Sequence, residues 1–212
     1  FVPVAEKLLV DLEQQSARIR SLDGEMRGQL VIASLMSIAH QVLPAALVEF
    51  RKQHPKMVIR VREGFGPGVA DDVRSATADI GIGSAPSASP DILIDDIVDE
   101  RFFAVLPGTH RLARRAAIKL DDLAGQQLVS MPIESGLRRM VDLAASKSGV
   151  VLDHSLITNQ FGTLFRFVAN GLGVGIVPAT VLPSRHDTSI AIVPIRPARN
   201  SPHRYFTAAP FH

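Results

Sequence analysis

Small residues that follow predicted strands are the part of this sequence best suited to chemistry. Ser37 lies in the turn after a strand predicted over residues 30–33, just before a helix. A serine in that place presents its hydroxyl beside free backbone N–H groups, and this combination binds a carboxylate. The alternative is that Ser37 only caps the helix or forms a local turn, and the sequence gives the two interpretations equal weight.

Three further strand ends carry residues of the same kind. The segment Glu63–Gly68 alternates glycine with other residues, so its backbone can approach a ligand closely, although we favour a turn that requires positive φ. Gly83-Ser84 and the segment Ser130–Pro132 lie at the carboxyl ends of two later strands. Ligands of open α/β sheets bind at the carboxyl ends of strands, which makes these positions candidates for ligand contacts.

Enzyme motifs are absent from the sequence. It has no Gly-x-Ser-x-Gly, no Ser-x-x-Lys and no phosphate loop, and no two of its seven histidines have the spacing of a helical zinc site. The run Gly171–Gly175 follows a predicted helix rather than preceding one, so we interpret it as a helix cap and close packing instead of a dinucleotide loop. The acidic cluster of Asp95, Asp96, Asp99 and Glu100 is interpreted as solvated surface. We expect no catalysis, no cofactor and no metal.

Composition narrows the class of protein. The 212 residues are 46% hydrophobic and 21% charged, with no cysteine and a formal net charge of +2. These values exclude a disordered chain and allow one large or two small domains, and no apolar run is long enough to span a membrane. The absence of cysteine fits a reducing compartment, and no export signal is visible. The basic residues are scattered, so this chain by itself is not expected to bind nucleic acid.

Residues 1–26 predict one long helix of about 39 Å. Its apolar positions follow a heptad pattern with one polar exception: Phe1, Ala5, Leu8, Leu12, Gln15, Ile19, Leu22 and Met26. We favour a helix that pairs with another chain through Leu8, Leu12, Ile19 and Leu22. The alternative is an amphipathic helix that packs on its own domain.

The rest of the sequence alternates strands with helices. The first set predicts a parallel βαβαβ unit, with strands over 30–33, 57–62 and 79–83 and helices over 43–53 and 69–78. The second set has strands over 102–106, 127–131, 174–177, 190–195 and 204–208 and helices over 120–123, 136–148 and 161–170. The pattern therefore predicts an α/β protein of two lobes with a cleft between them.

An ordered set of motifs resembles the effector-binding domain of LysR-type transcriptional regulators. The motifs are Gly28–Ala33, Leu43-Pro44, Phe50–Pro55, Glu63-Gly64, Asp79–Gly83, Val105–Ala113, Leu120–Leu123 and Phe167–Pro178. The resemblance covers nearly the whole chain. It implies a type 2 periplasmic-binding-protein fold, with residues 1–26 as the linker helix, 27–101 and 198–212 as lobe I, and 102–197 as lobe II. It also implies that a DNA-binding winged helix and a last helix lie outside this chain.

The resemblance carries an effector site over to this sequence. Ser37 matches the Ser or Thr that commonly binds an effector carboxylate, while Gly66 stands where many members have a second hydroxyl and Ser84 where some have an arginine. Ser130 and Met131 are expected on lobe II, and Phe161 is expected to form an apolar wall or, more readily, to pack in the core. The full set of expected effector contacts is Ser34, Met36, Ser37, Gly66, Pro67, Ser84, Ser130, Met131 and Phe161.

The function that the resemblance implies is a sensor of a small organic effector, with an anion expected, bound in the interlobe cleft of a cytoplasmic regulator. Its expected partners are the effector, DNA through the domain outside this chain, and further copies in a homotetrameric dimer of dimers. Two alternatives stay open. One is a solute-binding protein of a transporter with the same fold, and the other is an enzyme built on this fold.

Overall fold

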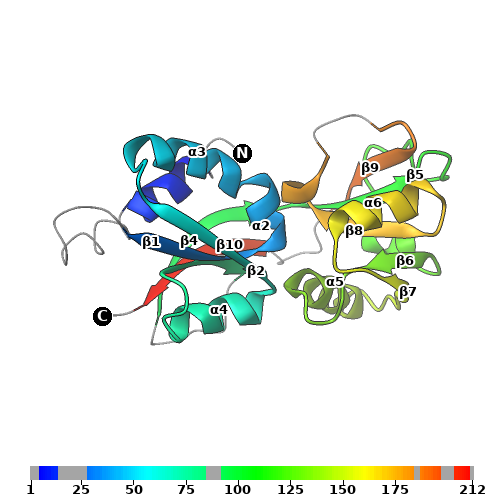
Figure 1. Ribbon diagram of the computed structural model, residues 1–212. Coiled ribbons are helices and arrows are strands. Elements are labelled where there is room, and N and C mark those ends of the chain that lie inside the picture. Colours follow the sequence, from blue (N-terminus) through cyan, green and yellow to red (C-terminus); the bar gives the residue numbers. More distant parts are fainter. Residues whose placement is uncertain (1–4, 14–27, 85–91, 184–186, 197–202, 211–212) are drawn as a thin grey trace. The chain divides into compact units, whose positions relative to one another are not determined.

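The computed structural model describes residues 5–13, 28–84, 92–183, 187–196 and 203–210 (Figure 1). The chain divides into two compact units. Unit 1 comprises residues 1–99 and 204–212, and unit 2 comprises residues 100–203. The sequence had placed these divisions at residues 101 and 198, and it had set residues 1–26 apart as a separate helix.

The sheet of unit 1 has the strand order β2-β1-β3-β10-β4. Its strands are β1 (Gln29–Leu35), β2 (Val58–Gly64), β3 (Ile80–Ser84), β4 (Ile92–Glu100) and β10 (His203–Pro210). Strand β1 runs parallel to both β2 and β3, and β10 runs antiparallel to β3. The predicted parallel βαβαβ arrangement is confirmed. Strand β4 was not predicted, because its run of acidic residues lacks the apolar pattern of a buried strand.

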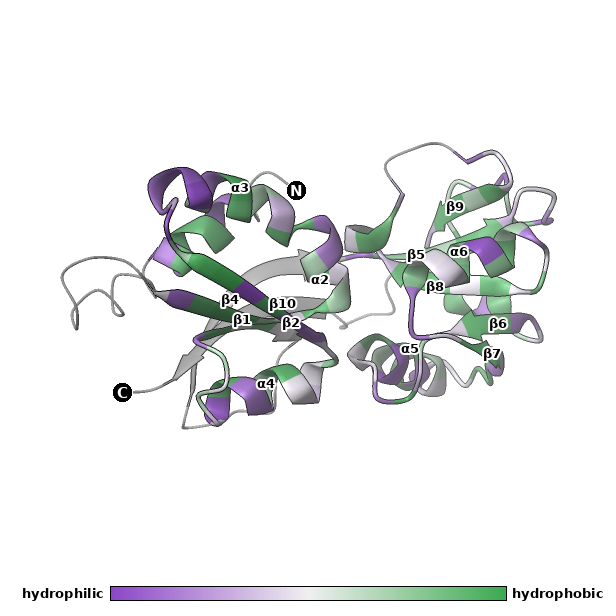
Figure 2. Ribbon diagram, in the orientation of Figure 1, coloured by the Kyte–Doolittle hydropathy of each residue, from purple (hydrophilic) through white to green (hydrophobic). Residues whose placement is uncertain are grey.

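Helices cover both faces of this sheet. Helices α2 (Met36–Gln41) and α3 (Leu43–Gln53) lie on one face and α4 (Gly66–Arg74) on the other (Figure 1). Helix α3 has the predicted bounds, with Pro44 in its first turn, where the missing N–H costs nothing. Figure 2 shows that the last turn of α3 is hydrophilic, whereas Phe50 is fully buried against the sheet. The short helix α2 was not predicted.

Residues 5–13 form a helix that packs on unit 1. Leu8 and Leu12 are both 0% exposed and belong to one core cluster with Leu43, Phe50 and Ile32. This placement differs from the predicted contact of Leu8 and Leu12 with another chain and fits the alternative of packing on the same domain. Ile19 and Leu22 lie outside the described residues, so their predicted role stays a prediction.

Helix α4 begins earlier than predicted and ends earlier. The predicted range was 69–78, but the helix begins at Gly66, with Pro67 in its first turn. Val69 and Val73 are buried on one face as expected, whereas Ala76 is exposed, lies beyond the helix and has a φ of 53°. The Gly-Pro-Gly sequence that suggested a turn is therefore a helix start, and among the described glycines positive φ occurs elsewhere in the chain.

The sheet of unit 2 repeats the same plan, with the order β7-β6-β8-β5-β9. Its strands are β5 (Phe102–Pro107), β6 (Gln127–Ser130), β7 (Asp153–Ile157), β8 (Val174–Pro178) and β9 (Ile190–Pro194). Strand β6 is parallel to β7 and β8, and β5 is antiparallel to β8 and β9. Two short 3-10 helices lie at Leu120–Leu123 and Ala179–Val181.

The longer helices of unit 2 are α5 (Gly136–Lys147) and α6 (Phe161–Ala169). Leu164 and Val168 of α6 are fully buried against Val105, Val129 and Val177 of the sheet. Both helices begin where the sequence predicted. Strand β7 was missed, because Asp153, His154 and Ser155 interrupt its apolar residues.

No helix among the described residues combines the length and the apolar character that crossing a membrane requires.

Candidate functional site

The carboxyl ends of the three parallel strands in unit 1 meet at one edge of the sheet. Leu35, the last residue of β1, pairs with Gly64, the last residue of β2, and Ser34 pairs with Ile82 of β3. Helix α2 begins directly after β1, and α4 begins within two residues of β2. This edge therefore presents the backbone N–H groups of two helix starts, which is where open α/β sheets bind ligands.

Two of the predicted serines lie at this edge in different surroundings. Ser34 is 0% exposed, and its hydroxyl donates to the carbonyl of Leu35 at 3.1 Å, so the hydroxyl is used within the fold. Ser37 is the second residue of α2 and is 7% exposed. Within the described residues no hydrogen bond engages its hydroxyl, and the residue before the helix is Leu35, so Ser37 is not the N-cap.

The remaining predicted contacts of unit 1 lie at the same edge. Met36 is half-buried and opens α2, while Gly66 is buried and opens α4, followed by the exposed Pro67. Ser84 ends β3, where its backbone pairs with Tyr205 of β10. The fold thus brings together six sequence-predicted positions that are separated by up to 50 residues.

The corresponding edge of unit 2 holds Ser130 and Met131. Ser130 ends β6 opposite Ile157, the last residue of β7, and Met131 follows it at 3% exposed. Phe161 begins α6 and packs against the core cluster of unit 2, which is the core role that was the stronger expectation for it.

The Ser130 hydroxyl is one end of a chain of hydrogen bonds that the sequence did not reveal. The Ser130 hydroxyl is 2.6 Å from Nδ1 of His154, and Nε2 of His154 is 2.8 Å from Oδ1 of Asp142. Nε of Arg138 donates to Oδ2 of the same carboxylate at 2.8 Å. The four residues come from β6, β7 and α5. Only the Arg138–Asp142 spacing of four residues on one helix gave a sequence signal for any part of it.

The surroundings of His154 favour the neutral form of its imidazole ring. Burial lowers the pKa of His154 most, and the nearby charge of Arg138 lowers it further, while Asp142 and Asp153 act in the opposite direction. The net effect is a pKa below the ordinary value of 6.5.

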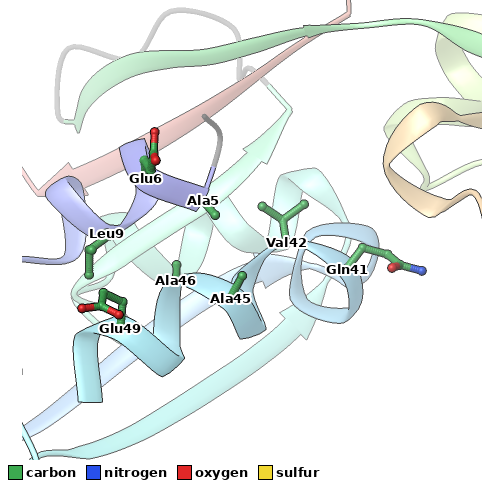
Figure 3. Close-up of a pocket in the computed structure, with 8 residues that line it drawn as sticks. All are labelled: Ala5, Glu6, Leu9, Gln41, Val42, Ala45, Ala46 and Glu49. Atoms are coloured by element: carbon green, nitrogen blue, oxygen red, sulfur yellow. The ribbon is translucent and has the colours of Figure 1, made fainter. Parts of the chain in front are cut away.

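The structure also contains a cavity of about 280 Å³ away from all these residues. Figure 3 shows it between the helix over 5–13 and helices α2 and α3, lined by Ala5, Glu6, Leu9, Gln41, Val42, Ala45, Ala46 and Glu49. Its walls are mainly apolar, and its two charged lining residues are both carboxylates. Because like charges repel, this cavity is unsuited to an anion, and the strand ends remain the better candidate for an anionic ligand.

Within the described part of the chain, no group of three or more His, Cys, Asp or Glu residues could hold a metal ion.

Comparison with known protein families decides what this fold is. The sequence pattern of the LysR substrate-binding domain matches residues 23–210. The chain belongs to this family. The resemblance seen in the sequence motifs is thereby confirmed, and the solute-binding protein of a transporter is not favoured.

Several transcriptional regulators resemble this LysR substrate-binding domain along most of its length. The HTH-type transcriptional regulator SsuR of Burkholderia cenocepacia is 26% identical over 186 residues, which are 87% of this chain and 60% of the relative. CysB of the same organism is 27% identical over 191 residues, covering 90% of this chain and 61% of the relative. The uncharacterised regulator YfeR of Shigella flexneri is 24% identical over 192 residues, covering 91% and 62%. The chain therefore spans about three fifths of the length of these relatives.

Solved structures confirm the fold class. The effector-binding domain of QuiR in complex with shikimate has a TM-score of 0.76 at 17% identity, covering 87% of this chain and 88% of that one. The effector-binding domain of BenM with its effector benzoate has a TM-score of 0.73 at 19% identity, covering 88% and 85%. The two-sheet α/β architecture predicted from the sequence, of the type 2 periplasmic-binding-protein kind, is the one observed.

Proposed function

We propose that this chain is the effector-sensing part of a LysR-type transcriptional regulator. The observation that carries the proposal is the family match over residues 23–210, together with relatives named as HTH-type transcriptional regulators. In this proposal DNA is bound by a domain outside this chain, the regulator acts in the cytoplasm as a homo-oligomer, and the chain has no enzymatic activity of its own.

The effector in this proposal is a small organic carboxylate bound at the carboxyl ends of the parallel strands. Ser37 donates its hydroxyl to the carboxylate, and the backbone N–H groups at the start of α4, beside Gly66 and Pro67, face the same negative charge. Met36 and Ser84 in unit 1 and Ser130 and Met131 in unit 2 are the other proposed contacts. The Ser37 hydroxyl supports this role because no described residue engages it. Ser34 and Phe161 leave the proposed set, since the first uses its hydroxyl internally and the second packs in the core.

A thermal-shift screen against small aromatic and aliphatic carboxylates tests this function. A carboxylate at about one hundred times its dissociation constant adds roughly 2.7 kcal/mol of stability. Ser37→Ala removes one hydroxyl without adding volume, and a hydrogen bond to a charged group contributes about 1.5–3 kcal/mol, so we expect roughly ten- to hundredfold weaker binding of the same compound.

Ser146→Ala is the matched control, because Ser146 is an exposed serine within α5. Binding in this control should equal that of the unaltered chain. Equal affinity of the unaltered chain and Ser37→Ala would remove Ser37 from the site, and a screen in which no carboxylate stabilises the chain would contradict the proposed effector class.

A further inference from the structure

The chain of hydrogen bonds from Ser130 to Arg138 determines which of its atoms carry a proton. Asp142 already accepts a hydrogen bond from Nε of Arg138, so its carboxylate is an acceptor and Nε2 of His154, 2.8 Å away, must be the donor. A neutral imidazole with its proton on Nε2 has a bare lone pair on Nδ1. The atom 2.6 Å from Nδ1 is the Ser130 oxygen, and only its hydroxyl proton can fill that contact.

The surroundings of His154 keep the ring in this neutral form. Its side chain is only 12% exposed, and the charged groups that face it are Arg138 and Asp142 from α5 and Asp153 from its own strand. Burial and Arg138 together lower the pKa of His154 below 6.5, so the ring is mainly neutral at pH 7.

We propose that this chain of hydrogen bonds, the relay from Ser130 through His154 and Asp142 to Arg138, makes Ser130 a hydrogen-bond acceptor toward the effector. The effector then presents a donor to Ser130: a hydroxyl, an amine or an amide N–H. The Ser130 hydroxyl donates its hydrogen bond to Nδ1 of His154, so its oxygen can offer a ligand only lone pairs. Ser130 keeps 7% of its surface exposed at the carboxyl end of β6. The inference rests on the proposed function, because it assigns the polar group of the effector that contacts Ser130.

The relay assigns different chemistry to the two serines. Within the described residues the Ser37 hydroxyl is free to donate and suits a carboxylate, whereas Ser130 suits a hydrogen-bond donor. A plain hydrocarbon acid offers Ser130 no donor, whereas a hydroxy or amino acid offers one. The expected effector class is therefore a carboxylate that also carries a hydrogen-bond donor.

Protonation of His154 reverses the polarity of Ser130. In the imidazolium form both ring nitrogens donate, Nε2 to Asp142 and Nδ1 to the Ser130 oxygen, and the serine proton becomes free to turn toward a ligand. As the pH falls through the pKa of His154, Ser130 changes from acceptor to donor. The preference for donor-bearing effectors should then decline.

The first test needs no ligand and measures the ring directly. Nitrogen-15 NMR of the full chain, with the His154 signal identified by its loss in His154→Asn, reports which ring nitrogen carries the proton. We expect the proton on Nε2 at pH 7 and a bare Nδ1. A proton on Nδ1 at pH 7 would overturn the inference.

The second test uses probes that vary charge and donor separately. Shikimate has a carboxylate and hydroxyls, 1-cyclohexene-1-carboxylate has only the carboxylate, and the methyl esters of both lack the charge; 4-hydroxybenzoate, benzoate and their methyl esters form a second set. We expect each donor-bearing compound to bind about three- to tenfold more tightly than its partner without a donor at pH 7.5, as one neutral hydrogen bond allows.

Variants of the relay separate the chemistry of Ser130 from a general loss of structure. His154→Phe removes the acceptor and frees the Ser130 hydroxyl to donate as well as accept, so the donor preference should shrink. His154→Asn offers a carbonyl oxygen near the place of Nδ1 and should keep the preference. His110→Phe is the control, because His110 is in unit 2 and hydrogen-bonds Gln126 instead. In the unaltered chain the preference should shrink at low pH.

The outcomes distinguish this inference from the proposed function. If hydroxylated esters bind and no carboxylate does, the carboxylate effector is wrong and the acceptor role of Ser130 stands. If donor-free acids bind as well as their hydroxylated partners, the proposed function stands and the inference is overturned. If no donor-bearing probe stabilises the chain, the inference is overturned as well.

Discussion

A serine hydroxyl takes its chemistry from its neighbours, and Ser37 and Ser130 show this within one chain. Each ends or follows a buried strand and each is 7% exposed. The Ser130 hydroxyl is committed to His154, whereas no described residue engages that of Ser37. Residue type and position at a strand end are therefore insufficient to assign a ligand contact; the partner on the other side of the hydroxyl decides whether it donates or accepts.

The lowered pKa of His154 also links protonation to folding. The unfolded chain takes up this proton near pH 6.5, whereas the folded chain resists it until lower pH. The folded state thus binds fewer protons in that interval, and its free energy of unfolding falls as the pH drops from above 6.5 through the pKa of the folded form. Urea unfolding between pH 8 and pH 5 should show a smaller loss of stability in His154→Asn, which does not titrate there. An identical pH dependence in both chains would contradict this expectation.

At the residue scale the sequence indicated several site positions but not their connections. Ser37, Gly66 and Ser130 were found because small residues after a predicted strand are informative by position alone. The relay was invisible because Ser130, Asp142 and His154 lie 12 or more residues apart on three elements. Its formation depends on the register of β6 against β7, which local patterns do not set.

Among the elements, the turn from α6 to β8 is fixed by two glycines. Gly171 has a φ of 76° and closes α6 through N–H bonds from Gly171 to Val168 and from Leu172 to Phe167, the pattern of a Schellman cap. Gly173 has a φ of 147°, and a Cβ there would lie 2.6 Å from the backbone oxygen of Gln127. The sequence prediction that this glycine run serves capping and close packing is confirmed.

Gly173→Ala should therefore destabilise unit 2 substantially. The added methyl group meets the backbone of β6, which cannot move aside as a side chain can, and the φ is unfavourable for alanine. We expect a loss of about 2–3 kcal/mol, measured by chemical denaturation. Gly162→Ala, in the first turn of α6 with nothing within 4 Å of its added Cβ, is the matched control and should be neutral or slightly stabilising. Equal stabilities of the two variants would show that the close approach of Gly173 to the backbone of Gln127 does not require glycine.

The elements that the sequence predicted well are those with a strong local signal. Helix α3 was predicted with its observed bounds because Pro44 and the apolar spacing agree, and a basic last turn marks its end. The predicted range of helix α4 was shifted toward the C-terminus because Gly66, Pro67 and Gly68 are typical of a turn. In the structure Phe65 precedes the helix in an extended conformation and Pro67 occupies the first turn, so packing of Val69 and Val73 on the sheet outweighs the low helix propensity of glycine.

At the scale of the whole molecule, the heptad pattern of residues 1–26 could stabilise unit 1 or pair two copies of the chain, and the helix over residues 5–13 shows what its first part does. Leu8 and Leu12 complete the core of unit 1, so the first part of the pattern is explained within one chain. The apolar cavity between this helix and α3 lies beside the same contact. The predicted pairing between copies therefore falls to the later positions, Ile19 and Leu22, which lie outside the described residues.

Substitutions at the two ends of this pattern should have different consequences. Leu12→Ala leaves a cavity in the core of unit 1, so we expect a loss of about 2–5 kcal/mol of stability, seen in chemical denaturation. Ile19→Lys places a charge where two helices would meet, so it should lower the mass measured by light scattering and leave the unfolding of unit 1 unchanged. Val10→Ala, on the same helix as Leu12 but at a position that is 49% exposed, controls for the effect of any substitution there. An Ile19→Lys chain with the mass of the unaltered chain would contradict the predicted pairing of copies through Ile19.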